Sequence, residues 1–418
     1  MTSPARPDGL PAYIAVTAAY WAFMLTDGAL RMLVLLHFHS LGFSPLQLAY
    51  LFVFYEVAGM ATNLGAGWIA ARFGLASTLY AGLGLQVLAL AALALLDPAW
   101  SVTFSVVFVM AVQGTSGVAK DLAKMSSKSA VKLLAPTDSG GLFRWVAILT
   151  GSKNAVKGLG FLLGAGLLAL MGFKTSVWSM AAVLAVVLIA VLIAMPPGLP
   201  RGCKSAKFSE VFSRSANINW LSASRVFLFG ARDVWFVVGV PVYFHALLSD
   251  GSAEGNRAAF FMIGGFMAVW IILYGGVQAN APRLLHASTR TEAELIAIAQ
   301  RWAMALFGVL LALTIATTVA PGPDLWTTLL LVAGLLVFGA VFAVNSSLHS
   351  FLILAFSRED RVTMDVGFYY MANAGGRLIG TVLSGLTYQV GGLSLMLGTA
   401  TIMVAVSTAM ARRLQAGT

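Results

Sequence analysis

Positive charges interrupt several of the long apolar stretches of this 418-residue chain. A charge at bilayer depth is energetically expensive, so it generally faces a polar cavity and marks the path of a ligand or an ion. Arginine and lysine bind carboxylate and phosphate groups through charge-assisted hydrogen bonds. The pattern therefore predicts a membrane protein whose interior holds an anion with several negative groups. The six cations concerned are Arg31, Lys153, Lys157, Arg225, Arg232 and Arg377.

Lysines also recur at the end of the fourth apolar segment, where Lys120, Lys124 and Lys128 are four residues apart and so share one helix face. We predict that Lys120 and Lys124 line a funnel that attracts anions. Lys128 and Lys132 are better explained as anchors at the membrane surface. In the fifth segment, Lys153 and Lys157 have the same spacing and no acid in their own helix. Their predicted partner is a bound anion or an acid from another helix.

Two carboxylates are predicted near the middle of the membrane. Asp27 lies roughly 20 Å along the first segment, and Arg31 follows one helical turn later. The two residues pair with each other or contact the ligand, and both can hold at different stages of transport. Asp27 is also a candidate for proton coupling. Glu56 is either a proton-coupling group or a structural partner of Arg31 or another cation. Arg377 either contacts the ligand or pairs with an acid such as Asp365.

No known catalytic motif is present. HExxH, G-x-S-x-G, Walker A and G-x-G-x-x-G are all missing from the sequence. Cys203 is the single cysteine, which excludes an internal disulfide. The five histidines are scattered, and no metal site is predicted from them. We therefore expect neither an enzyme nor a cofactor.

The composition indicates which elements position these groups. The chain is 59% hydrophobic and 10% charged, whereas a soluble domain carries about 25% charged residues. Runs of roughly 20 apolar residues span a bilayer as helices, because a helix satisfies its own backbone hydrogen bonds. We predict an all-α integral membrane protein with twelve spans. They cover approximately residues 12–38, 45–70, 76–96, 101–124, 143–170, 175–195, 218–247, 259–281, 301–320, 325–356, 362–389 and 392–411.

A polar stretch divides the spans into two groups of six. The predicted organisation is an N-terminal six-helix bundle at 1–195, a central cytoplasmic loop at 196–217 and a C-terminal six-helix bundle at 218–418. Lys and Arg concentrate in loops on one side, so both termini are predicted to be cytoplasmic. The net charge of +10 reflects this topology and the intramembrane cations rather than nucleic-acid binding. The first helix of each half carries a deep arginine and a Phe-His pair, namely Arg31 with Phe38-His39 and Arg232 with Phe244-His245.

The loop after the second span resembles the signature of the major facilitator superfamily, G-x-L-A-D-R-F-G-R-K. Gly67, Ala70, Arg72, Phe73 and Gly74 match it, whereas Ala71 and Leu75 replace an acidic and a basic residue. The resemblance implies the twelve-helix facilitator fold, with Gly67, Arg72 and Gly74 in the signature loop, and a monomer. The two departures weaken the charge latch that the family usually forms there.

Further stretches are similar to the bacterial organoarsenical efflux permease (ArsJ) family. They are Tyr20–Leu33, Ala119–Lys132 and Phe143–Gly158, with a weaker match at Asp233–Pro241. This resemblance implies export of 1-arseno-3-phosphoglycerate across the bacterial inner membrane and arsenate resistance. It also implies a functional partnership with glyceraldehyde-3-phosphate dehydrogenase, which makes that compound. The alternatives are an organophosphate/phosphate or other organic-anion antiporter, and a membrane sensor or lipid-modifying enzyme.

Overall fold

The computed structural model describes residues 10–134, 141–195, 213, 215–286, 290–320, 324–357 and 362–415, and within them it contains helices and no strands. The predicted all-α membrane class is confirmed. The elements are α1 (Leu10–Ser40), α2 (Pro45–Tyr50), α3 (Val53–Phe73), α4 (Leu75–Leu93), α5 (Val102–Leu134), α6 (Gly141–Ala194), α7 (Ala216–Val234), the π-helix η1 (Trp235–Gly239), α8 (Val240–Leu248), α9 (Ala253–Leu284), α10 (Glu292–Val319), α11 (Leu325–Phe356) and α12 (Val362–Ala411).

Local sequence signals account for several helix starts. Ser44 and Thr291 each begin a capping box, in which the hydroxyl accepts a backbone N–H of the first turn. Asp324 caps α11 by accepting the Thr327 N–H at 2.6 Å. Gly74, with φ at 77°, makes the turn between α3 and α4, a conformation that favours glycine. This turn belongs to the predicted signature loop.

Ten helical stretches in the described part of the chain are long and apolar enough to cross a membrane. Two of the helices are unusually long and break at glycines. In α6, which has 54 residues, Gly172 adopts a φ of 72°, and in α12, with 50 residues, the break lies at Gly391 and Gly392. A single crossing needs about 20 residues, so each is long enough for two. The count of twelve spans stays a prediction on this basis.

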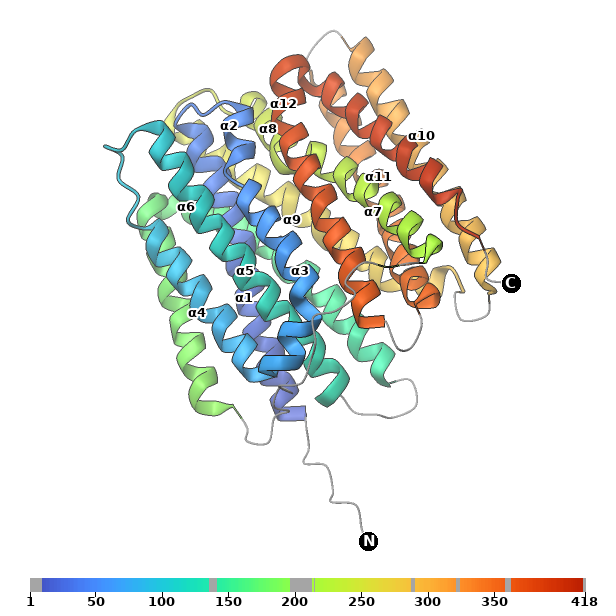
Figure 1. The fold of residues 1–418 in the computed structure, drawn as a ribbon. Coiled ribbons are helices and arrows are strands. Elements are labelled where there is room, and N and C mark those ends of the chain that lie inside the picture. The colour runs from blue at the N-terminus through green and yellow to red at the C-terminus, as the bar shows by residue number, and fades with distance from the viewer. Residues whose placement is uncertain are drawn as a thin grey trace.

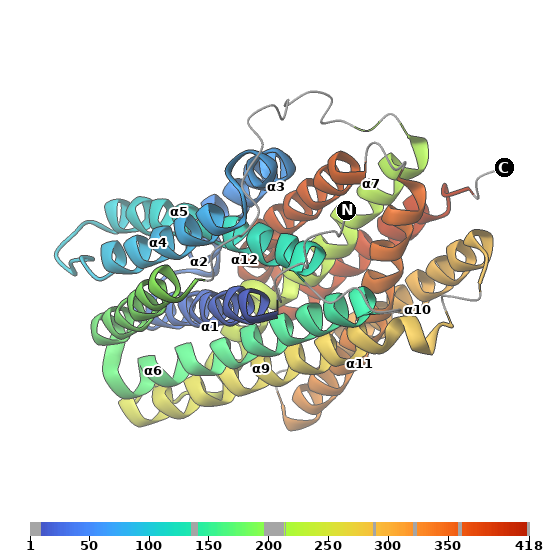
Figure 2. The same cartoon turned by 90° about the horizontal axis from the view of Figure 1, so that it is seen from below.

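The helices pack as two neighbouring groups. Figure 1 shows one group, α1 to α6, coloured blue to green, beside the second group, α7 to α12. The most extensive contacts between the two groups are those of α6 with α9 and of α12 with α2 and α3. Figure 2 shows the first part of α6 lying beside α9. The predicted loop at 196–217 falls mostly outside the described residues, so the domain boundaries stay a prediction.

Large apolar side chains cover the outer surface of several helices. Leu88, Val186, Ile193, Trp326 and Ile402 are each at least 65% exposed. A soluble monomer rarely exposes extended apolar patches, whereas lipid tails solvate such side chains well. The exposed faces are therefore lipid-facing, and the polar groups described below lie on the opposite, inner faces.

A π-helical turn follows the deep polar residues of α7. The backbone N–H groups of Val238 and Gly239 both donate to the Ser384 hydroxyl, at 3.2 and 3.1 Å. Pro241, which has no N–H, comes two residues after this turn. Ser384 of α12 thus satisfies donors at an irregular stretch of buried helix, which keeps this turn stable at bilayer depth.

Replacement of Gly160 by alanine is expected to destabilise the protein. A Cβ atom there would lie 2.5 Å from the Leu25 carbonyl oxygen of α1, so the two helices would have to separate. Overpacking of this kind typically costs about 1–3 kcal/mol. Gly265→Ala is the matched control, because a Cβ atom at that position meets nothing within 4 Å. Thermal unfolding of both variants in detergent checks the prediction, and equal melting temperatures would contradict it.

Candidate functional site

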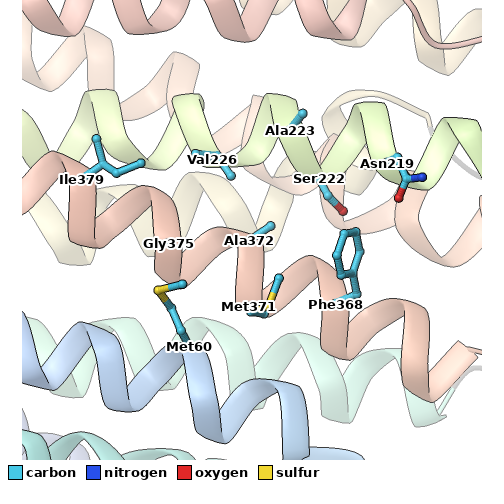
Figure 3. A pocket seen from close by; sticks show the side chains of 10 residues that line it. All are labelled: Met60, Asn219, Ser222, Ala223, Val226, Phe368, Met371, Ala372, Gly375 and Ile379. Carbon is cyan, nitrogen blue, oxygen red and sulfur yellow. The ribbon is translucent and has the colours of Figure 1, made fainter. Parts of the chain in front are cut away.

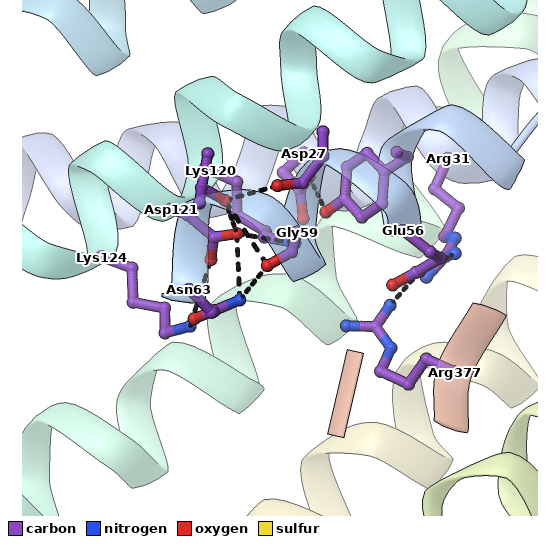
Figure 4. Close-up of polar contacts among 12 residues, drawn as sticks. Asp27, Arg31, Glu56, Gly59, Asn63, Lys120, Asp121, Lys124 and Arg377 are labelled. Carbon is purple, nitrogen blue, oxygen red and sulfur yellow. Dashed lines mark hydrogen bonds and ion pairs between the residues drawn. The ribbon is translucent and has the colours of Figure 1, made fainter. Parts of the chain in front are cut away.

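Glu56 lies between two arginines from opposite halves of the chain (Figure 4). Its Oε1 accepts hydrogen bonds from Arg31 of α1 at 3.0 Å and from Arg377 of α12 at 2.6 Å. The second oxygen, Oε2, is buried and has no hydrogen-bond partner. Glu56 therefore pairs with Arg31 and also holds a second cation, and the proton-coupling role stays a prediction.

Arg377 extends this chain of charges into the C-terminal half. Its Nε donates to Asp233 Oδ2 at 3.1 Å, and Arg232 Nε donates to Asp233 Oδ1 at 2.6 Å. The side chain of Arg377 thus joins a carboxylate of α3 to a carboxylate of α7. The partner of Arg377 is not Asp365, the example considered from the sequence, but two acids on other helices.

A second set of contacts surrounds Asp27. Lys157 of α6 donates to Asp27 Oδ2 at 2.7 Å, and the Tyr55 hydroxyl donates to Oδ1 at 2.6 Å. The ammonium group of Lys120 lies 4.1 Å from the centre of the Tyr55 ring, a distance at which a cation–π attraction is significant. Lys157 therefore pairs with an acid from another helix, which is one of the two partners predicted for it. Asp27 bonds across helices, to Lys157 and Tyr55, and Arg31 bonds to Glu56.

Asp121 organises the lysine stripe of α5. It accepts a hydrogen bond from Lys124 at 3.1 Å and lies 3.9 Å from the ammonium group of Lys120. Thr62 and Asn63 of α3 also donate to it, at 2.8 and 3.2 Å. One buried carboxylate therefore offsets the repulsion between two lysines one turn apart.

These contacts form what we call the central ion-pair network, in which the carboxylates are covered and the cations are more accessible. The four acid side chains are 0–2% exposed and the six cations are 11–17% exposed. Six cations against four carboxylates leave an excess of two positive charges. The members are Asp27, Arg31, Glu56, Lys120, Asp121, Lys124, Lys157, Arg232, Asp233 and Arg377.

Arg225 lies apart from this network and bonds to neutral groups. Its Nε donates to Asn373 at 2.9 Å, and its NH1 donates to the hydroxyl and carbonyl oxygens of Ser346 at 3.2 and 3.3 Å. The guanidinium group stacks 3.8 Å from the centre of the Phe229 ring. Gln278 of α9 also donates to the Ser346 hydroxyl, at 3.3 Å, and accepts from Asn154 of α6 at 3.0 Å. A polar path therefore links Arg225 to α6 in the other half.

A mostly apolar hollow of about 340 Å³ lies between α3, α7 and α12 (Figure 3). Met60, Val226 and Met371 contribute to its wall. Because its lining carries no cation, it is unsuited to bind a multiply charged anion.

The structure brings most of the predicted site residues together. Arg31, Lys120, Lys124, Lys157 and Arg232 belong to one network, together with Arg377 and the two predicted carboxylates. Lys153 is half-buried on α6, one turn before Lys157. The side chains of Lys128 and Lys132 lie outside the described residues, as does the environment of Gly67 in the signature loop. Arg72 is exposed at the end of α3.

Sequence reasoning missed three groups that hold the network in place. They are Asp121, Asp233 and Tyr55. The criterion that selected the cations, a charge at bilayer depth, also applies to Asp121 and Asp233. Applied to acids, it identifies both of them. No comparable signal marks Tyr55, because a tyrosine in an apolar segment is common.

Comparisons with known proteins support the fold. No family model matches the chain, and no curated protein matches it in sequence. A POT family transporter solved in complex with 5-aminolevulinic acid is similar over 97% of this chain and 96% of its own, with a TM-score of 0.71 and 13% identity. The nucleoside transporter NupG is similar over 96% of this chain and 98% of its own, with a TM-score of 0.65 and 16% identity. A bacterial homologue of the iron transporter ferroportin, in an outward-facing state, is similar over 96% of this chain and 99% of its own, with a TM-score of 0.65 and 14% identity. The chain therefore has the major facilitator type of membrane fold.

Proposed function

We propose that this chain is a secondary transporter that moves an organic oxyanion across the membrane by alternating access. The observation that carries the proposal is the central ion-pair network, with its excess of two positive charges and its more accessible cations. A substrate with two separated anionic groups would neutralise that excess. The structural neighbours are transporters, which supports the class of protein but not the substrate.

In the proposed mechanism, the buried carboxylates hold the cations until the substrate arrives. Each carboxylate is less exposed than the cation it pairs with, so the remaining N–H donors of the cation are the more accessible ones. An incoming oxyanion forms charge-assisted hydrogen bonds with these donors. We propose that Arg31, Lys120, Lys124, Lys153 and Lys157 bind from the N-terminal half, and Arg225 and Arg232 from the C-terminal half.

Alternating access needs a contact between the halves that breaks and reforms. Arg377 bonds to Glu56 of α3 and to Asp233 of α7, so it joins the two halves directly. A substrate that competes for Arg31 or Arg232 would also weaken the bonds that hold Arg377. Binding would in this way shift the equilibrium toward a state in which the halves have moved.

For the substrate, we propose 1-arseno-3-phosphoglycerate, on the strength of the sequence resemblance to the organoarsenical efflux permeases. This compound carries an arsenate and a phosphate group, which suits cations contributed by both halves. The corresponding biological role is export across the bacterial inner membrane after synthesis by glyceraldehyde-3-phosphate dehydrogenase. Both termini would be cytoplasmic, the protein would work as a monomer, and Gly67, Arg72 and Gly74 would form the signature loop.

Proton coupling is the proposed use of Asp27 and Glu56. Each is a buried carboxylate held by cations. An ionised carboxylate without a partner is unfavourable in a buried site, so it would bind a proton when its cations turn to the substrate. Transport that is unaffected by collapse of the proton gradient would contradict this part of the proposal.

The proposed substrate is tested in everted membrane vesicles that contain the protein. The vesicles receive arsenate, glyceraldehyde 3-phosphate, NAD and the purified dehydrogenase, and arsenic uptake is measured. We expect uptake that requires every component and that disappears in the Arg232→Ala variant. Vesicles with the Gly265→Ala variant are the control, because an added Cβ atom at that position meets nothing within 4 Å.

Two other results would change the assignment. Uptake from arsenate alone would identify a carrier of inorganic oxyanions. No arsenic uptake, combined with exchange of an organophosphate for phosphate preloaded in the vesicles, would identify the antiporter alternative. Full uptake by the Arg232→Ala variant would remove Arg232 from the proposed site.

A further inference from the structure

The two Phe-His pairs of the sequence meet in the structure. His39 lies near the end of α1 and His245 lies in α8, and their ring centroids are 4.6 Å apart with an interplanar angle of 78°. The two rings come from opposite halves of the chain, at corresponding places in the first helix of each half. The repeated motif thus becomes a pair of imidazoles that pack edge to face across the interface.

Each imidazole has one buried nitrogen that makes no hydrogen bond. The free nitrogens are His39 Nδ1 and His245 Nε2, which are both buried and have no hydrogen-bond partner. A metal-binding histidine coordinates the ion through one ring nitrogen, and a buried nitrogen without another partner is suited to that role.

We propose that His39 and His245 form a binding site for a divalent transition-metal ion of the zinc, nickel or copper class. Imidazole nitrogen suits these ions, and a tetrahedral Zn–N length of about 2.0–2.1 Å puts two ligand nitrogens roughly 3.4 Å apart. Rings 4.6 Å apart allow that separation. Coordination would also satisfy two buried nitrogens that otherwise have no partner.

The site has two protein ligands. Within the described residues, no group of three or more histidine, cysteine, aspartate or glutamate side chains could hold a metal ion. Both rings are only partly buried, so water completes the coordination shell. The affinity is therefore lower than that of a structural zinc site with four protein ligands.

A bound ion would fasten the two halves at this end of the molecule. The halves already touch here, because the Leu46 N–H of α2 donates to the Gln389 side chain of α12 at 3.2 Å. Gly385 of α12 also packs against the backbone of Pro45 and Leu46. Metal binding adds a bridge between α1 and α8 to these contacts, so it should stabilise this arrangement of the halves. The proposal does not depend on the identity of the transported substrate.

The test uses the purified full-length protein without a polyhistidine tag. Binding of Zn²⁺ is measured by calorimetry, and Cu²⁺ is added as a spectroscopic probe whose electron paramagnetic resonance spectrum reports nitrogen ligands. We expect one ion per chain, two nitrogen ligands and a higher melting temperature with Zn²⁺. His39→Ala and His245→Ala should each weaken binding at least about tenfold.

His37→Ala is the matched control. His37 lies on the same helix, but its ring stacks on Phe173 within its own half, with centroids 4.0 Å apart. It should bind Zn²⁺ like the wild type. If either alanine variant fails to fold, His39→Gln and His245→Gln retain a polar side chain of similar size for the same measurements. Wild-type protein that binds no ion, or unchanged binding after loss of either histidine, would overturn the proposal.

Discussion

Replacement of Arg377 by glutamine is expected to abolish transport and to destabilise the protein. The guanidinium group bonds to Glu56 at 2.6 Å and to Asp233 at 3.1 Å, and both acids are at most 1% exposed. Two charge-assisted hydrogen bonds of about 1.5 kcal/mol each correspond to roughly a 100-fold change in rate or affinity. Each acid keeps one other arginine, so the loss of folding stability should be about 2–4 kcal/mol rather than complete unfolding.

Vesicle transport and thermal unfolding measure the two effects. Arg377→Lys preserves the charge, but a lysine lacks the fixed fork of N–H donors that reaches both acids. This variant should therefore regain more of the lost folding stability than of the lost transport. Arg412→Gln, at an exposed position near the C-terminus, is the control for loss of an arginine elsewhere. Wild-type transport by Arg377→Gln would show that the bridge between the halves is not part of the cycle.

The Lys157→Ala substitution is expected to lower the folding stability more than the double substitution of Lys157 and Asp27 by alanine. Lys157→Ala leaves Asp27, whose side chain is 2% exposed, with the Tyr55 hydroxyl as its one side-chain hydrogen-bond donor among the described residues. An unpaired buried charge of this kind costs about 3–5 kcal/mol. In the double variant Lys157→Ala with Asp27→Ala no charge is left unpaired, so most of that stability should return.

Transport should not return with it. If Lys157 contacts the substrate, as we propose, the double variant is stable but inactive. Unfolding temperatures of the two single variants and the double variant form a complete cycle, which isolates the interaction between the residues. A double variant as unstable as Lys157→Ala would contradict the ion pair, and a double variant with full transport would contradict the binding role.

The fold could be predicted from the sequence because hydropathy alone specifies where helices cross a bilayer. The predicted span 325–356 coincides with α11, and the predicted span 218–247 corresponds to α7, η1 and α8 together. The π-helical turn within the latter was not predictable. It depends on Ser384, which is 146 residues from Val238 in the chain and next to it in space.

The members of the site were largely predictable, but their pairing was not. An arginine or lysine in an apolar segment is conspicuous, so the cations could be found one by one. Which acid each cation meets depends on the rotation and depth of neighbouring helices. Asp27 and Arg31 are one turn apart, yet they bond to Lys157 and to Glu56 on different helices. The sequence is compatible with an Asp27–Arg31 pair and with pairs to other helices, and the packing of the helices decides between them.

The seam between α6 and α9 has a mechanical consequence. Glycines of both helices face the partner helix there, so closely that a Cβ atom at Gly264 would lie 2.6 Å from Ala165 and one at Gly275 would lie 2.7 Å from Asn154. Contact this close leaves no free volume between the two helices, so a larger residue at either glycine would force them apart. Any movement of the halves along this seam should therefore be as sensitive to one added methyl group there as to the loss of an ion pair in the central network.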